Sequence, residues 1–113
     1  MITARLERDG QRFCLEVAGH AGYGPRGEDI VCAAVSALVY GLSGFTKRLE
    51  KEGLALSSTS VELSPGQARI CLYPQAQAED RTAGAFALAA EILDLLGKNF
   101  PGNIQFTLKR RKR

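Results

Sequence analysis

The 113-residue sequence predicts one α+β domain, in which an antiparallel sheet carries two helices on one face. The length is that of a single domain with one core. Several short segments alternate apolar and polar residues, as strands do, and two long segments repeat apolar residues at helical spacing. The expected element order is ββαββαβ. A composition of 45% hydrophobic and 24% charged residues excludes collagen-like, disulfide-dense and wholly disordered chains.

The first two strands are expected over residues 2–7 and 13–17, where apolar residues occupy alternate positions. These apolar residues are Ile2, Ala4, Leu6, Phe13, Leu15 and Val17. Asp9 and Gly10 lie between the two segments and form a pair typical of hairpin turns. The two strands should therefore pair antiparallel.

A glycine-rich loop is expected over residues 18–29, because four glycines and a proline in twelve residues prevent regular structure. Asp29 is a good N-cap for a helix that runs from Ile30 to about Lys51 and ends before Gly53. Its apolar stripe recurs at spacings of three and four residues. The stripe consists of Val31, Val35, Leu38, Leu42, Phe45 and Leu49.

The second half of the chain predicts two further strands, a helix and a last strand. A third strand region covers residues 54–63 and is interrupted by the serine-rich segment 57–60. Ser64-Pro65-Gly66-Gln67 has proline and glycine where a type II turn requires them, and a strand follows over 68–72. A second helix is expected over 78–96, with Phe86, Ala89, Ile92, Leu93 and Leu96 at helical spacing and Gly97 just past its end. The last strand is expected over 104–108, on alternating Ile104, Phe106 and Leu108.

The net charge of +3 is concentrated in a basic C-terminal tail, Lys109-Arg110-Arg111-Lys112-Arg113. Without these five positive charges, the domain formed by residues 1–108 carries −2. The pI of about 8.9 therefore describes the tail, and it does not indicate a basic groove for nucleic acid. The tail is expected to be a solvated end.

The chain is expected to stay in the cytoplasm. Its N-terminus is a charged, strand-like segment and has no apolar signal sequence. The apolar run over residues 30–45 is interrupted by polar residues and glycines and is shorter than a membrane span requires, so we interpret it as a core helix. In that compartment thiols are reduced, and Cys14 and Cys71 are assigned to packing. Three cysteines and one histidine without ligand spacing make a zinc site improbable, and no metal is expected.

Reactive side chains converge where the loop meets the first helix. Cys32 lies at about the third helical position, where unpaired backbone amides and the helix dipole favour the thiolate form of a cysteine. His20 lies twelve residues earlier, on a loop that must return to the helix start, so a cysteine nucleophile and a base can meet there. Asp29, Cys32 and Ser36 have a spacing that places them on one side of the helix.

A structural explanation of the same residues stays open at this point. Cysteines in helices are more often small buried hydrophobic residues than nucleophiles. A single loop histidine is more often a surface residue than a base. Asp29 could serve only as the cap, and Ser36 could simply occupy a helix face.

The loop and helix start resemble the signature of the ribosomal-processing cysteine protease family, Prp. The resemblance rests on Gly19-His20-Ala21, Tyr23, Gly27 and the run Asp29-Ile30-Val31-Cys32-Ala33-Ala34-Val35-Ser36, including the His-to-Cys interval. It implies a small dimeric α+β cysteine protease that removes an N-terminal extension from a large-subunit ribosomal protein precursor, after a pair of aromatic residues. No metal or cofactor is implied.

The resemblance also implies roles for individual residues. Cys32 would be the nucleophile and His20 the general base, while Asp29 and Ser36 would support the site. Gly19, Gly22, Gly24 and Gly27 would let the loop open and close over the peptide. Since no residue is marked by its position as a partner that orients His20, a Cys-His dyad is expected.

A non-enzymatic ribosome- or RNA-associated module is the alternative, with the basic tail supplying affinity. Nucleic-acid platforms interleave aromatic and basic residues on strands, and this sequence has few such aromatics. As part of the protease hypothesis, the tail Lys109–Arg113 is expected to make at most a weak contact with ribosomal RNA. Rapid alkylation of one cysteine at pH 6 to 7 would favour the protease.

Overall fold

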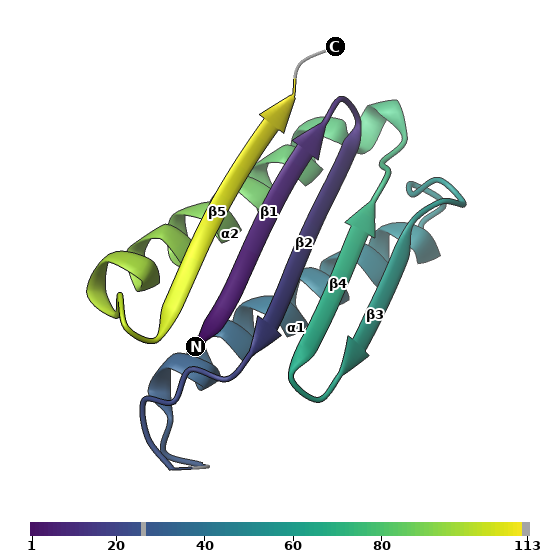
Figure 1. The fold of residues 1–113 in the computed structure, drawn as a ribbon. Coiled ribbons are helices and arrows are strands. Elements are labelled where there is room, and N and C mark those ends of the chain that lie inside the picture. Colours follow the sequence, from purple (N-terminus) through teal and green to yellow (C-terminus); the bar gives the residue numbers. More distant parts are fainter. Residues whose placement is uncertain (26, 112–113) are drawn as a thin grey trace.

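The computed structural model describes residues 1–25 and 27–111, and it confirms the α+β fold (Figure 1). The elements are β1 (Ile2–Asp9), β2 (Arg12–Gly19), α1 (Ile30–Lys51), β3 (Ser60–Ser64), β4 (Gln67–Leu72), the 3₁₀ turn η1 (Ala76–Ala78), α2 (Glu79–Asn99) and β5 (Ile104–Arg111). The first helix has the predicted bounds.

The five strands form one sheet in the order β3-β4-β2-β1-β5. The pairs β1–β2, β2–β4 and β3–β4 are antiparallel, whereas β1 and β5 are parallel, with Ile2 opposite Ile104. The expectation of an entirely antiparallel sheet is therefore wrong for this one pair. Helix α2 lies between β4 and β5 in the chain. It returns the chain to the end of the sheet where β1 begins, so that β5 can run parallel to β1.

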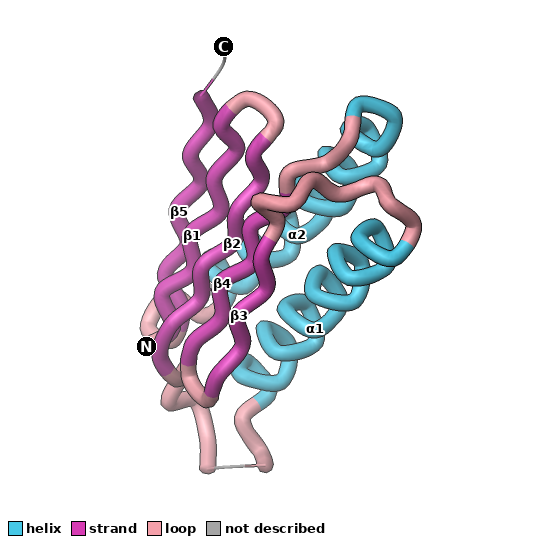
Figure 2. Tube along the Cα trace, turned by 90° about the vertical axis from the view of Figure 1, so that its right-hand side faces the viewer, coloured by secondary structure: helices cyan, strands magenta, loops and turns pink. Residues whose placement is uncertain are grey.

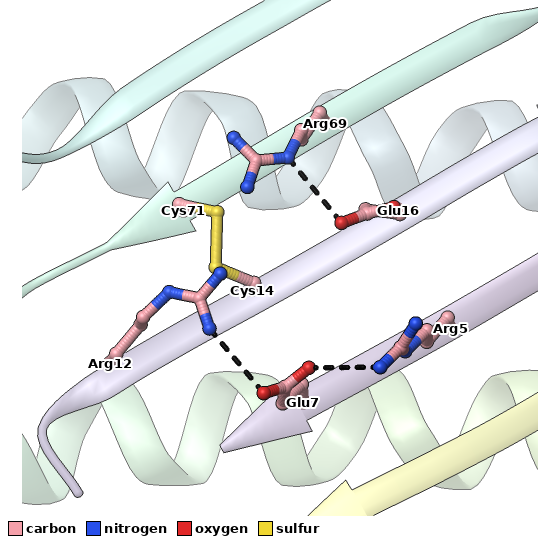
Figure 3. Close-up of polar contacts among 7 residues, drawn as sticks. All are labelled: Arg5, Glu7, Arg12, Cys14, Glu16, Arg69 and Cys71. Carbon is pink, nitrogen blue, oxygen red and sulfur yellow. Dashed lines mark hydrogen bonds and ion pairs between the residues drawn. A yellow bond between two sulfur atoms is a disulfide. The ribbon is translucent and has the colours of Figure 1, made fainter. Parts of the chain in front are cut away.

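Both helices cover the same face of the sheet, as predicted (Figure 2). The core lies between the two layers, and its largest fully buried side chains include Phe13, Phe86, Leu15, Ile70 and Leu93. On α1 the buried residues include Val31, Val35, Leu42 and Leu49 of the predicted stripe. The opposite face of the sheet is open and carries ion pairs, namely Arg5 and Arg12 with Glu7, and Arg69 with Glu16 (Figure 3).

Three boundaries differ from the sequence predictions. The first hairpin turns at Gly10 and Gln11, one residue later than expected, with Gly10 at φ 61. The third strand is limited to Ser60–Ser64. The second helix continues through Gly97 to Asn99, because Phe100 N–H still donates to Leu96 O. Ile92, which was predicted to face the core, is 37% exposed.

The last strand extends into the basic segment. Lys109, Arg110 and Arg111 continue β5 and pair with Glu7, Arg8 and Asp9 of β1. The register places Lys109 opposite Glu7 and Arg111 opposite Asp9, which are pairs of opposite charge, while Arg110 lies opposite Arg8, a pair of like charge. These three residues are therefore part of the sheet and do not form the frayed end that the notion of a tail implied, although their side chains are exposed to solvent as expected. Lys112 and Arg113 lie outside the described residues.

Cys14 and Cys71 form a disulfide bond on the open face of the sheet (Figure 3). The prediction that they are reduced packing residues is wrong. They are directly opposite in the antiparallel β2–β4 pair, with Cα atoms 4.2 Å apart, so the register of the two strands brings the two side chains together. Disulfides are common in oxidising compartments and rare in the cytosol. The bond therefore gives no support to the cytoplasmic location, which stays a prediction.

The apolar run considered in the sequence covers only residues 30–45 and is shorter than a membrane span, whereas the whole of α1 has 22 residues. By length and composition alone, α1 could cross a membrane. The core helix of a soluble protein meets the same criterion, and the buried stripe of α1 packs against the sheet and α2. We therefore retain the interpretation as a core helix.

Candidate active site

Asp29 organises the start of α1 and the loop before it. As predicted, it is the N-cap: its Oδ1 accepts a hydrogen bond from Cys32 N at 2.9 Å. Its Oδ2 accepts from Tyr23 N at 3.0 Å and from Gly24 N at 3.4 Å. The Cys32 N–H is the main cause that holds the pKa of the Asp29 carboxyl below its ordinary value of 3.8. Desolvation opposes this effect, and the two loop amides and the Cys32 side chain each lower the pKa further. One carboxylate thus ties the loop to the helix.

Cys32 presents a half-buried sulfur to the loop. Because Cys14 and Cys71 are bonded to each other, Cys32 is the only free cysteine in the sequence. Ala21 N donates a hydrogen bond to its Sγ at 3.3 Å. Such a donor favours a negatively charged sulfur over a neutral one.

His20 follows the last residue of β2 and is exposed. Its imidazole lies against Gly66 in the turn between β3 and β4, where a Cβ atom would come within 3.2 Å of Nε2. The backbone is fixed at this point, since Gly19 N donates to Gly66 O at 2.9 Å. Gly19 has φ 98, and a Cβ there would collide with the carbonyl oxygen of Met1. Within residues 1–25 and 27–111, no side chain hydrogen-bonds to the His20 ring.

A cleft of about 440 Å³ brings His20, Cys32 and Ser36 together. It lies between α1 and the β3–β4 hairpin, and its other lining residues are Ile2, Val17, Gly19, Val35, Val39, Tyr40, Leu63, Ser64, Pro65, Gly66, Gln67 and Ala68. Asp29 does not line the cleft, and acts on the site through backbone amides. A thiol and an imidazole at the wall of an open, partly apolar cleft are the groups that peptide cleavage by a cysteine nucleophile requires.

Sequence reasoning missed Tyr40 as a lining residue of the cleft and the place of the β3–β4 turn in it. Tyr40 is 68% exposed and follows Cys32 and Ser36 at four-residue intervals, so helical spacing alone could have identified it. The turn at Pro65 and Gly66 was predicted, but its place beside His20 depends on the pairing of β4 with β2. Among the described residues, no group of three or more His, Cys, Asp or Glu side chains could hold a metal ion.

Comparison with known protein families shows to which family the chain belongs. The family described as cysteine protease Prp matches residues 1–105. The chain belongs to this family. It is therefore a cysteine protease, and the match extends from β1 into the start of β5, well beyond the segment on which the sequence resemblance rested.

Solved structures share the fold over nearly the whole chain. The ribosomal processing protease Prp from S. aureus, in complex with a covalently linked product peptide, is 21% identical, with a TM-score of 0.68 over 96% of this chain and 100% of that one. The same protease with a substrate peptide is 19% identical, with a TM-score of 0.65 over the same shares. SMU.848 from Streptococcus mutans is 25% identical, with a TM-score of 0.68 over 98% of this chain and 96% of that one. No curated protein matches the chain.

Proposed function

We propose that this Prp-family protease removes the N-terminal extension of a large-subunit ribosomal protein precursor. The observation that supports this most is that His20 and the free cysteine Cys32 line one cleft in a chain of this family. The S. aureus relative is a ribosomal processing protease and has been solved with substrate and product peptides, which favours a peptide substrate here too.

The proposed mechanism uses a Cys-His dyad. His20 accepts the proton of the Cys32 thiol, and the sulfur attacks the scissile carbonyl carbon. His20 then gives this proton to the leaving amine as the C–N bond breaks. The extension is then bound to Cys32 as a thioester. Water, deprotonated by His20, attacks this thioester and releases the extension with a new carboxylate, and the proton returns the sulfur to its starting state. No cofactor takes part in this sequence of steps.

The first test is incubation of the chain with a precursor that carries an aromatic pair before its mature N-terminus, followed by mass analysis of both products. Cys32→Ala should lower the rate by at least about a thousandfold and His20→Ala by about a hundredfold, because each removes one of two groups that act in the same steps. Thr46→Ser, a conservative change at a buried α1 position away from the cleft, is the control and should keep its activity. A Cys32→Ala protein that still trims the precursor would contradict the proposal and favour the binding module.

The role of the basic segment is a separate proposal, namely a weak contact with ribosomal RNA through Lys109–Arg113. Because Lys109–Arg111 belong to β5, deleting the segment would also shorten the sheet. The better variant is Arg110→Gln combined with Arg111→Gln, which keeps the strand and removes two charges. Co-sedimentation with ribosomes at low salt should weaken, and unchanged co-sedimentation would refute the contact.

We also propose that the protein is a homodimer. The open face of the sheet is charged and is a poor candidate for the interface. On α2, Leu88, Ile92 and Leu95 form an exposed apolar stripe at helical spacing and are a better one. Sedimentation of the chain and of Leu88→Glu tests this: the chain should sediment as a dimer and the variant as a monomer, whereas a monomeric chain would refute the proposal.

A further inference from the structure

The turn between α2 and β5 contacts the glycine-rich loop over residues 18–29 at two points. Asn103, the last residue of this turn, donates a hydrogen bond from Nδ2 to Ala21 O at 2.9 Å. Three residues earlier, the Phe100 ring packs edge-on against Tyr23, with ring centroids 5.3 Å apart. Both contacts join segments about 80 residues apart in the chain, so no local pattern predicts them.

Both contacts lead to Cys32, the first through Ala21 and the second through Tyr23 and Asp29. Ala21, whose carbonyl is held by Asn103, donates its own N–H to Cys32 Sγ at 3.3 Å. Tyr23, which packs on Phe100, donates its N–H to Asp29, and Asp29 accepts from Cys32 N. Since the Cys32 N–H is occupied by its cap, the amide that reaches the sulfur comes from the loop.

The support behind Ala21 is rigid. Asn103 N donates to Phe100 O at 2.9 Å, and Asn103 O accepts from Ile2 N at 2.8 Å, so its backbone is fixed to both the turn and β1. Ala21 is 2% exposed, which leaves its peptide groups little access to water. Because the Ala21 carbonyl is held and the residue is buried, the Ala21 N–H is placed before the sulfur becomes charged, and preorganised donors stabilise charge better than groups that must reorient.

We infer that Asn103 is a positioning residue for the nucleophile: it holds the backbone of Ala21 at its carbonyl, so that the N–H of the same residue, in the preceding peptide group, stabilises the Cys32 thiolate. The inference rests on the proposed role of Cys32. It adds a residue from the far end of the chain to the site, and it gives the α2–β5 turn a role in reactivity in addition to connecting two elements.

The test measures the reaction of Cys32 with iodoacetamide as a function of pH, without any substrate. Cys32 is the only free thiol, so the rate reports on it alone. Asn103→Ala should lower the rate at pH 6 to 7 by about tenfold, since a hydrogen bond to a charged group is lost or misdirected. The loss should shrink as the pH rises, because the thiol then ionises without the amide.

Two further variants separate positioning from structure. Asn99→Ala removes a similar hydrogen bond, from Asn99 Nδ2 to Leu95 O at 2.9 Å. Asn99 is the last residue of α2, and this bond does not involve the glycine-rich loop. It should react like the unchanged chain. Asn103→Asp keeps the shape of the side chain but places a carboxylate against Ala21 O, and it should react at least as slowly as Asn103→Ala. If Asn103→Ala does not fold, the alkylation rate of Asn103→Asp tests the inference in its place.

The inference is wrong if both Asn103 variants react at the unchanged rate, or if they lose the same factor at every pH, which would indicate altered access to the sulfur. Precursor cleavage distinguishes this failure from that of the proposed function. If alkylation responds as expected but the chain cleaves no precursor, the inference holds and the proposed substrate is wrong. If the chain cleaves the precursor but the alkylation rate does not respond to the Asn103 variants, the proposed function holds and the inference is wrong.

Discussion

At the residue scale, Asp29 illustrates what the sequence could and could not predict about the site. An acidic residue before an apolar helix predicts a cap, and this part is confirmed by its bond to Cys32 N. The bonds from Tyr23 and Gly24 depend on how the glycine-rich loop returns to the helix. That path is set by contacts with residues far along the chain, such as Phe100 and Asn103, which no local pattern contains.

The pKa of Asp29 gives a prediction for stability at acid pH. Because its carboxyl has a lower pKa in the folded state than its ordinary 3.8, the charged form stabilises the fold fully above about pH 4 and is lost as the pH falls through the folded value. The stability difference between the chain and Asp29→Asn, measured by urea unfolding, should therefore shrink below pH 4. A difference that is constant from pH 7 to pH 3 would contradict the role of the charge.

At the scale of elements, the β3–β4 hairpin supplies the wall of the cleft behind His20. Its turn was predicted from Pro65 and Gly66, and the φ of 73 at Gly66 agrees with the glycine position of a type II turn. The sequence could not place this turn beside His20, because adjacency of β2 and β4 follows from the order of the whole sheet.

Substitution of Gly66 tests the contact between this turn and His20. Gly66→Ala should lower the free energy of unfolding by about 1 kcal/mol through its positive φ, and should also displace the imidazole and slow precursor cleavage. Gly53→Ala is the matched control, since Gly53 has the same φ of 73 and nothing within 4 Å of an added Cβ. Equal activity losses in both variants would show that the contact with His20 has no role.

At the scale of the whole molecule, the sheet brings together residues that the sequence keeps apart. The fold class, the helix over residues 30–51 and the face that each helix buries were all predictable from periodicity. The parallel β1–β5 pair and the Cys14–Cys71 bond were not, because both depend on which strands become neighbours and in which register.

The disulfide closes a segment of 57 residues and should stabilise the whole fold. A cross-link of this span reduces the entropy of the unfolded chain by up to about 4 kcal/mol at 25 °C. Reduction should therefore lower the urea midpoint of the chain, while a Cys14→Ala, Cys71→Ala double variant should be insensitive to reductant. If alkylation of the unfolded chain without reductant labels all three cysteines, the disulfide is absent.

The catalytic role of Cys32 is tested most directly by trapping the covalent intermediate. A precursor is mixed with the chain, the reaction is stopped with acid within seconds, and the mass of the protease is measured before and after peptide mapping. The mechanism predicts an increase equal to the acylated N-terminal extension, located on the peptide that contains Cys32 and absent in Cys32→Ala. Turnover of the precursor with the adduct on any other residue would contradict it.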